Sequence, residues 1–455
     1  MNQPKRIAIV GGGTAGLSAA LRLRERGYDD VTVFEGSAQV GGKACSVEVD
    51  GRYYDLGGVV VVPQRYPNTW ALARRYGLQT FLREPMLAVD LDTAEWTGLE
   101  AAIAAAHSTR AYLGSAIKVR RYIKRYRKYF DKPGFSFNHC PELGWLRDEL
   151  SLPLEQWVKK LRLAPLASMW EPVVDMGYGP YSEVAALYFI YFRLCTPRHG
   201  IRSLLMQKLQ GGAERLSFTL GAQSLAIAMA KDCHVRTEVP VSRVVRKQEG
   251  LWIYAGDGRE LGTFDAVLLA TPLDDAFDLL DASGASSALN NAITKTGARV
   301  KREIRYADYY VTIADGDGLP DASGYVSLGS QHLGLAGGHI GLRPWPQSPW
   351  WVFYYHGSPE QPGCQEAALE ELHTQLEKVG VTLKTTVLTK AWPKFFPHVS
   401  QSAIANGFYD DLESLQGQGD IFYLGGALGF ESLEHTITYS YGLADQHFPA
   451  IRSGN

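Results

Sequence analysis

Residues 7–16, with the sequence Ile-Ala-Ile-Val-Gly-Gly-Gly-Thr-Ala-Gly, decide the fold of this chain. The apolar run Ile7–Val10 predicts a buried parallel strand, and a G-x-G-x-x-G turn and a helix over Leu17–Arg26 follow it. A second strand, Val31–Glu35, ends in an acid. This order is that of a βαβ unit, in which the N-terminus of the helix binds the pyrophosphate of a dinucleotide.

Each glycine of the turn has its own steric role. Gly11 permits the tight turn, Gly13 lets the backbone approach the phosphates, and Gly16 lets the helix pack closely on the strand. Glu35 lies 19 residues beyond Gly16, where a carboxylate can accept both ribose hydroxyls and would repel a 2′-phosphate. We therefore expect FAD or NAD, not NADP. The predicted contacts in this unit are Gly11, Gly13, Thr14, Ala15, Gly16 and Glu35.

The composition is that of a large globular protein without a strong overall field. At 455 residues the chain can bury a large core, and we expect two or more lobes. Its 46 basic and 48 acidic residues give a net charge of −2, which argues against nucleic acid as a partner. No apolar stretch approaches the roughly 20 residues that span a bilayer. Because the first strand begins almost at the N-terminus of this sequence, we expect no signal peptide.

The cysteines and histidines indicate neither disulfides nor a metal site. The five cysteines are odd in number and scattered, without C-x-x-C spacing, and the eleven histidines form no H-x-x-x-H pattern. Free thiols are typical of a reducing compartment. We therefore expect a cytoplasmic protein, with peripheral membrane contact at most, and no bound metal.

The α/β pattern breaks off after about Arg75 and returns near Gly211. The returning part predicts a helix over Leu225–Lys231. The strands expected there are His234–Val241, Val244–Lys247, Leu251–Tyr254, Ala266–Ala270 and Ile421–Leu424. Residues between the pieces are strand-like at Ala307–Ile313, Trp350–Tyr355 and Thr385–Lys390.

This pattern predicts an α/β fold whose Rossmann-like dinucleotide-binding domain is discontinuous. We expect residues 1–75, 206–285 and 413–455 to form that domain. Residues 76–205 are expected to form a helical insertion or lid, and residues 286–412 an α+β substrate domain.

Four further motifs carry a family resemblance: Gly41-Gly42-Lys43, the segment Tyr54–Gly58, the strand His234–Val241 and Ala270-Thr271-Pro272. With them the chain resembles the flavin amine oxidase and phytoene desaturase superfamily of FAD enzymes. The resemblance implies that the double glycine and lysine approach the FAD diphosphate and ribityl chain, that Gly57 and Gly58 run beside the flavin, and that the backbone of Val241 pairs with adenine. It favours FAD over NAD. The contacts that it implies are Gly41, Gly42, Lys43, Gly57, Gly58, Val241, Gly425 and Gly426.

Passages outside the cofactor motifs resemble one branch of that superfamily, the polyunsaturated fatty acid isomerases that make conjugated linoleic acid. The similar passages are Leu152–Leu154, Gly177–Gly179, Val184–Ala186, Thr271–Leu273 and Phe396–Ser400. The resemblance implies hydride abstraction to flavin N5 from a polyunsaturated acyl or other lipophilic substrate, and its return at another carbon, without a general base. A desaturase stays open, as do an amine or amino-acid oxidase that produces peroxide and a flavin-bound scaffold without catalysis.

The chain departs from the superfamily pattern in the C-terminal strand-to-helix turn. An acid usually follows the glycine there, but Gly425 is followed by Gly426, and the nearest acid is Glu431. Glu431 either replaces the missing contact or is a plain loop carboxylate. The resemblance to the isomerases also implies an arginine that holds the substrate carboxylate at the mouth of the tunnel. Arg83 lies in the corresponding region of this sequence. A substrate without a free carboxylate stays open.

Candidates for the substrate pocket are mostly aromatic. Val184–Phe192 is too short for a membrane span and predicts a buried helix, on which Tyr188 or Phe192 would also line a hydrophobic tunnel. Tyr178 stands between two glycines, which suits close approach to a flat ring. His398 is more typical of a hydrogen-bonded structural histidine than of a catalytic base.

The segment Lys118–Phe130 is strongly basic. Val119, Tyr122, Ile123 and Tyr126 recur at helical spacing, and seven basic residues occupy most of the other positions. Three interpretations are open: a solvated helix that rests on the core, a helix that lies on an anionic membrane surface, and a docking site for an acidic acyl carrier protein.

Overall fold

The strand that opens the sequence lies at the centre of a five-stranded parallel sheet with the order β20-β13-β1-β2-β9. Its strands are β1 (Ile7–Val10), β2 (Val31–Phe34), β9 (His234–Arg236), β13 (Ala266–Leu269) and β20 (Ile421–Tyr423). Residues from the start, the middle and the end of the chain therefore share one sheet. The strands β1, β2 and β13 are buried along their whole length, as apolar parallel strands are when both faces are covered.

The computed structural model describes residues 6–58, 63, 66–82, 86–98, 109–130, 144–163, 177–194, 216–328 and 338–451. Arg83 and the segment near Gly211, both named in the predictions above, lie outside these ranges.

Helices and a second sheet enclose the parallel sheet. The helices are α1 (Thr14–Glu25), α2 (Pro67–Arg75), α10 (Gln223–Ala230), α11 (Leu273–Leu279) and α17 (Leu433–His447), of which α1 packs against α10 and α17. The second sheet is antiparallel except at one edge, and its strands are β10 (Val241–Lys247), β11 (Gly250–Ala255), β12 (Glu260–Phe264) and β14 (Leu280–Asp281). Val244, Leu251 and Ile253 of this sheet join the core around β1.

The stretch His234–Val241, expected as one strand, is divided in the structure, and that expectation was wrong. β9 ends at Arg236, and Val241 begins β10 in the other sheet. Glu238 between them has a positive φ of 57°, and Pro240 has no N–H to donate to a ladder. The chain therefore leaves the parallel sheet and enters the antiparallel one within four residues.

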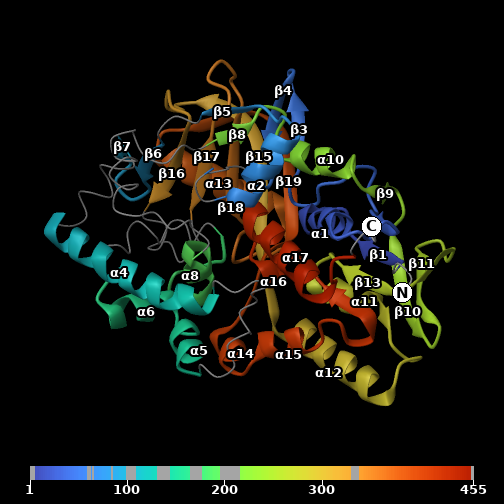
Figure 1. Ribbon diagram of the computed structural model, residues 1–455. Helices are drawn as coiled ribbons and strands as arrows, with labels where there is room; N and C mark the ends of the chain where they lie inside the picture. Colours follow the sequence, from blue (N-terminus) through green and yellow to red (C-terminus); the bar gives the residue numbers. More distant parts are fainter. Residues whose placement is uncertain are drawn as a thin grey trace.

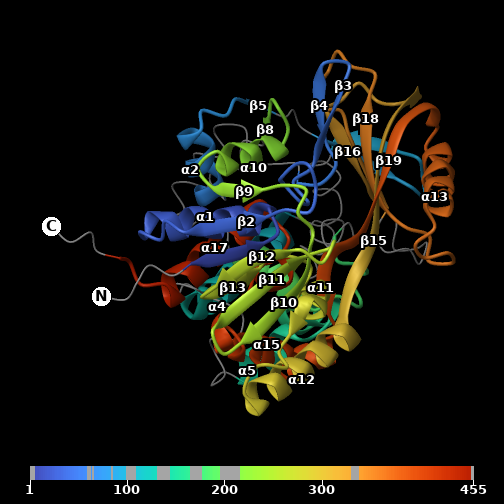
Figure 2. The ribbon, with the colours of Figure 1, turned by 90° about the vertical axis from the view of Figure 1, so that its right-hand side faces the viewer.

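A seven-stranded sheet with the order β19-β15-β18-β17-β16-β6-β7 forms the other half of the protein. Its strands are β6 (Leu87–Asp90), β7 (Trp96–Gly98), β15 (Ile304–Asp317), β16 (Gly324–Leu328), β17 (His339–Leu342), β18 (Trp351–His356) and β19 (Thr382–Val399). Helix α13 (Gln365–Lys378) packs on it, and Figure 2 shows both on the side away from α1. β6 and β7 come from the stretch that we expected to be helical, so this stretch also contributes an edge to the sheet. The domain boundaries themselves stay a prediction.

The smaller elements complete the fold. Two further antiparallel pairs are the hairpin of β3 (Ser46–Val49) with β4 (Arg52–Asp55) and the long-range pair of β5 (Thr80–Leu82) with β8 (Leu216–Phe218). A helical region seen at the left of Figure 1 holds α4 (Thr109–Phe130), α5 (Gly144–Leu150), α6 (Leu154–Leu161) and α8 (Ala186–Leu194). Near the C-terminus follow α14 (Gln401–Ala405), α15 (Phe408–Ser414), a 3₁₀ turn over Gln418–Asp420 and α16 (Gly426–Gly429). No helix in the described ranges is long and apolar enough to cross a bilayer.

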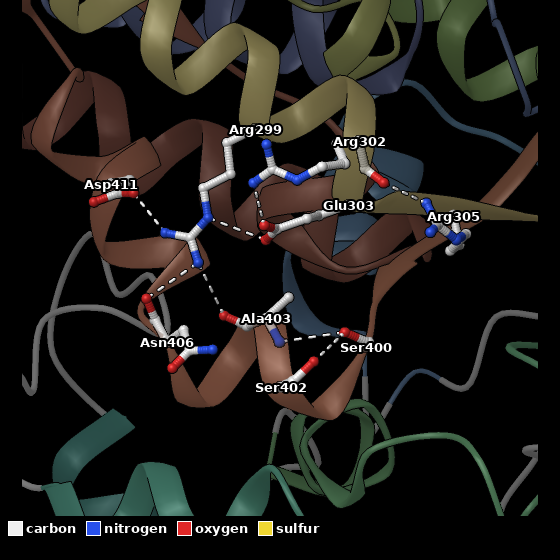
Figure 3. Close-up of polar contacts among 9 residues, drawn as sticks. All are labelled: Arg299, Arg302, Glu303, Arg305, Ser400, Ser402, Ala403, Asn406 and Asp411. Atoms are coloured by element: carbon white, nitrogen blue, oxygen red, sulfur yellow. Dashed lines mark hydrogen bonds and ion pairs between the residues drawn. The ribbon is translucent and has the colours of Figure 1, made fainter.

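One arginine joins α12 (Ser287–Glu303) to the helices that follow the long strand β19 (Figure 3). Arg299 Nε donates to Glu303 at 3.0 Å and Nη1 donates to Asp411 at 2.5 Å. Nη2 donates to the carbonyl oxygens of Asn406 and Ala403, at 3.1 and 3.4 Å. A carbonyl at a helix end has no intrahelical donor, so the guanidinium satisfies groups that α14 leaves open.

We predict that Arg299→Ala lowers the free energy of unfolding by about 2 kcal/mol. The change leaves Asp411 without its cation and leaves Glu303 with only the exposed Arg302. It also removes the donor to the carbonyl oxygens of Ala403 and Asn406. Urea denaturation measures the change. Arg302→Ala on the same helix is the matched control: its side chain is 68% exposed, and an exposed ion pair contributes about 0.5 kcal/mol or less. Equal losses in the two variants would contradict the assignment.

Candidate active site

Glycine-bearing segments approach one another at the carboxyl end of β1 so closely that side chains do not fit between them. Gly11 has a φ of 111°, and a Cβ there would lie 2.8 Å from the carbonyl oxygen of Ala270. A Cβ on Gly16 would lie 2.0 Å from the carbonyl oxygen of Gly11. The helix α1 is therefore held directly against the end of the parallel sheet.

The first turn of α1 presents free backbone donors at this edge of the sheet. Gly13 is the N-cap, its residue type offers no side-chain oxygen, and no acid stands in the first turn. The N–H groups of Thr14, Ala15 and Gly16 precede the first intrahelical donor, Leu17, whose N–H bonds to Gly13. Free donors at the positive end of a helix dipole are a site for an anion such as a phosphate.

The acid at the end of β2 is held in a fixed position. Glu35 Oε2 accepts from the N–H of Gly12 and Oε1 accepts from the N–H of Ser37, both at 2.8 Å. Gly36 lies against Pro240, with 3.5 Å from its would-be Cβ to Pro240 Cα. This contact brings Val241, at the start of β10, to the same end of the sheet as Glu35.

The loop Gly41–Lys43 lies across the glycine turn. Gly41 forms a bridge with Gly13, and a Cβ on Gly42 would lie 3.3 Å from Gly13 Cα. A Cβ on Gly57 would lie 1.8 Å from the carbonyl oxygen of Lys43, which accepts from the N–H of Gly58 at 3.3 Å. The three glycine segments predicted from the sequence therefore form one continuous surface.

Glu431 closes this surface from the C-terminal side. Its carboxylate pairs with the ammonium of Lys43, with Nζ 2.8 Å from Oε1 and 3.0 Å from Oε2. The Glu431 side chain is only 11% exposed, and Oε2 lies 2.8 Å from where Gly426 would carry a Cβ. The carboxylate thus lies where the side chain of an acid at position 426 would project. It is not a loop carboxylate free in solvent.

A buried hydroxyl adds to the polar lining at the end of β13. Thr271 Oγ1 is buried and has no hydrogen-bond partner among the described residues. The backbone carbonyl oxygen of Thr271 lies 3.7 Å from where Gly425 would carry a Cβ. A buried polar atom normally has a partner. The open donors of α1, this hydroxyl and the fixed Glu35 carboxylate fit the diphosphate and ribose of FAD.

Comparison with known proteins agrees with this lining. The family model "Flavin containing amine oxidoreductase" matches residues 14–300. The chain belongs to the flavin-containing amine oxidoreductase family. Its cofactor is FAD, as the family resemblance implied.

Several relatives of this family act on lipophilic compounds. The polyenoic fatty acid isomerase of Ptilota filicina is 24% identical over 200 residues, which is 40% of this chain and 40% of that enzyme. The neurosporene-forming phytoene desaturase of Rhodobacter capsulatus is 28% identical over 283 residues, or 56% of this chain and 50% of that enzyme. These matches span half or less of the two relatives.

Solved structures extend the likeness over nearly the whole chain. The CLA-producing fatty acid isomerase from P. acnes has a TM-score of 0.81 at 21% identity, covering 98% of this chain and 100% of that one. A putrescine oxidase has a TM-score of 0.67 at 17% identity, covering 97% and 98%. The resemblance to fatty acid isomerases and the α/β fold with a Rossmann-like FAD-binding domain and a substrate domain are confirmed.

A small pocket opens beside the Gly425–Gly426 turn. Its walls come from α8, α15, α16 and the segments next to them. The lining residues are Tyr178, Leu187, Tyr188, Tyr409, Gly426, Ala427, Leu428 and Phe430. The ring of Tyr178 stacks on Tyr188 with 4.9 Å between centroids and lies 5.2 Å from Phe430. The lining is apolar and aromatic, with no ionised side chain at neutral pH.

The phenols of this pocket bond to one another and to the backbone. Tyr188 and Tyr409 share a hydrogen bond of 2.8 Å between their hydroxyls, and Tyr188 Oη accepts from the N–H of Val399 at 2.7 Å. Burial raises the pKa of Tyr188 well above its ordinary value and also raises the pKa of Tyr409. Both phenols therefore stay protonated.

His398 lies behind the pocket wall. Its ring meets Tyr178 and Tyr188 edge-on at 6.0 and 6.1 Å, and it is not one of the lining residues. Nδ1–H donates to the carbonyl oxygen of Phe396 at 2.8 Å, and burial lowers the pKa of the imidazole. This geometry is that of a neutral, hydrogen-bonded supporting histidine.

Two of the predicted site residues cannot be placed, and several residues of the pocket were not predicted from the sequence. Arg83 and the side chain of Phe192 fall outside the described part of the chain. Leu187, Tyr409, Leu428 and Phe430 carry no motif and come from three distant stretches. The family resemblance at Phe396–Ser400 indicated only the end of β19, which lies behind the pocket wall and does not line the pocket. The cofactor contacts assigned to single residues stay predictions.

We predict that Glu431→Gln weakens FAD binding about tenfold, the worth of roughly one charge-assisted hydrogen bond. The Lys43→Met variant should weaken FAD binding by a similar factor. If the two residues act as a pair, the double variant should bind FAD no more weakly than either single variant. Quenching of FAD fluorescence on titration of apoprotein measures the dissociation constant.

Glu155→Gln on α6 is the control, because Glu155 also pairs with a lysine but on an exposed surface. If Glu431→Gln apoprotein bound FAD as tightly as the Glu155→Gln control, Glu431 would be a plain loop residue.

Proposed function

We propose that the chain is an FAD-dependent double-bond isomerase, or a closely related desaturase, that acts on a polyunsaturated acyl or other lipophilic substrate. The uncharged aromatic pocket beside the Gly425–Gly426 turn is the observation that carries this proposal. A pocket without a fixed charge favours a hydrocarbon chain over an ammonium or amino-acid group. The fold-level likeness to a fatty acid isomerase over 98% of the chain supports the same substrate class.

The residues of the pocket suit a reaction that moves a hydride, which bound FAD can accept and return. Their contribution is to orient the substrate and to exclude water, because no carboxylate or lysine is among the lining residues. The faces of Tyr178, Tyr188 and Phe430 also carry negative quadrupole density. Ring faces of this kind stabilise a positive charge that develops on a substrate carbon.

The hydrogen bonds behind the wall keep these rings in place. Val399 N–H and Tyr409 fix the hydroxyl of Tyr188, and Tyr178 Oη accepts from the N–H of Glu431 at 3.3 Å. The last bond links the pocket wall to the Lys43–Glu431 pair. We therefore propose that the cofactor site and the substrate pocket share this segment.

We predict that anaerobic addition of a polyunsaturated fatty acid changes the absorbance of the bound flavin, and that turnover in air consumes no net oxygen. The measurement is flavin absorbance together with an oxygen electrode, over a panel of fatty acids, carrier-bound acyl chains and amines. Stoichiometric peroxide with an amine would instead establish an oxidase. A yellow protein that responds to none of the panel would support the scaffold.

We predict that Tyr178→Phe retains kcat/KM within about threefold, since the aromatic wall is kept, and that Tyr178→Ala lowers it about 100-fold. The second figure corresponds to about 3 kcal/mol for loss of a buried aromatic ring. Steady-state kinetics on the substrate found by the panel measures both. A large loss in Tyr178→Phe together with a changed pH profile of kcat/KM would show that the phenol takes part in proton transfer, and it would overturn the mechanism without a general base. A large loss with an unchanged pH profile would show that the hydrogen bond from Glu431 N–H positions the ring.

A further inference from the structure

The helix α4 carries exposed basic side chains that form no ion pair with the carboxylates that the structure describes. It has no aspartate or glutamate over its 22 residues, Thr109–Phe130, although the whole chain has a net charge of −2. Five basic side chains of its described part are exposed: Lys118, Arg120, Arg121, Lys124 and Arg125. These five side chains lie within residues 118–125, about 11 Å along the helix axis, so the charges form a short stripe and not a point.

These charges are not neutralised within the described part of the molecule. No carboxylate there forms an ion pair with Lys118, Arg120, Arg121 or Lys124. Arg125 lies 4.0 Å over the ring of Trp145, a contact that keeps its charge. Elsewhere on this protein exposed arginines do pair with carboxylates, as Arg75 does with Glu25 and Asp232.

The apolar side of α4 is occupied by the protein itself. Val119 and Tyr126 are buried, and Trp157 Nε1 on α6 donates to Tyr126 Oη at 3.3 Å. Tyr126 Oη in turn donates to Glu149 on α5. The basic side is therefore held facing solvent. The helix can adsorb to an anionic surface by charge, but it has no free apolar face with which to insert.

The position of α4 connects this surface to the pocket. α4 packs on α8, which contributes Leu187 and Tyr188 to the pocket wall, and it lies at the outer edge of the molecule in Figure 1. Ile117, which immediately precedes Lys118 on α4, is 57% exposed and lies next to the basic side chains.

We infer that α4 is an electrostatic docking surface for an anionic membrane. The charge pattern alone indicates an extended anionic partner, because a stripe of single sign matches a charged plane. The preference for a membrane over an acidic protein rests on the proposed function, since a lipophilic substrate dissolves in the bilayer. Docking through α4 would bring the pocket behind α8 close to that source.

The test is sedimentation of the FAD-loaded protein with vesicles of phosphatidylcholine alone or mixed with phosphatidylglycerol. We expect binding only to the anionic vesicles, and weaker binding at high salt. Replacing Lys118, Arg120, Arg121 and Lys124 by glutamine should weaken binding about 1,000-fold, at the usual contribution of each basic residue. The matched control replaces Lys231, Arg259, Lys295 and Arg302, which are exposed, dispersed and equal in charge.

Equal vesicle binding by the two quadruple variants, or no binding by the unaltered protein, would overturn the inference. Flavin absorbance confirms that each variant retains its cofactor. If the unaltered protein isomerises a fatty acid supplied in solution but ignores vesicles, only the membrane inference fails. If it binds anionic vesicles through α4 but its flavin responds to no fatty acid, only the proposed function fails. Salt-dependent binding to an acidic acyl carrier protein, without vesicle binding, would identify the other partner.

Discussion

The structure depends on the direct contact of backbone with backbone at the carboxyl end of β1. At Gly11, Gly16 and Gly57 a Cβ would lie within 2.8 Å of a carbonyl oxygen. Any side chain at these positions would push α1 or the loop Gly41–Lys43 away from the sheet. The free N–H groups of α1 can face a ligand only because these segments touch. The glycines are therefore a packing requirement first, and the cofactor site follows from it.

The same contact determines where charge can be placed. The first turn of α1 offers open backbone donors to the anionic cofactor, so Lys43 can pair with Glu431. This pair is internally neutral and borders the pocket through the bond between Glu431 N–H and Tyr178 Oη. The pocket beyond it can then remain free of ionised groups. An apolar pocket beside a charged cofactor requires this separation.

The sequence predicted what depends on local patterns. The run Ile7–Val10 and the glycine turn have a fixed period and spacing, so the parallel sheet and α1 followed from them. The break between β9 and β10 did not, because Glu238 adopts a positive φ for which glutamate gives no signal. The pocket was also hidden: Tyr409 and Phe430 reach Tyr178 only through tertiary packing. The sequence did identify Glu431 as the nearest acid, but it left the role of Glu431 open, because only the tertiary structure places this carboxylate beside Gly426, five residues earlier in the chain.

The helical region links the two ends of this arrangement. Within α8, Leu187, Phe189 and Ile190 are buried, so these positions have no room for a hydrated charge. The helix offers one surface to the pocket and another to α4, which bears exposed basic side chains. A charge at Leu187 or Tyr188 would be desolvated at the pocket wall, whereas on α4 it stays hydrated one helix away. Because α8 forms the pocket wall and α4 carries the exposed charges, an apolar pocket and a strongly basic surface can lie on opposite sides of two packed helices. The charges on α4 stay hydrated, and the pocket stays apolar.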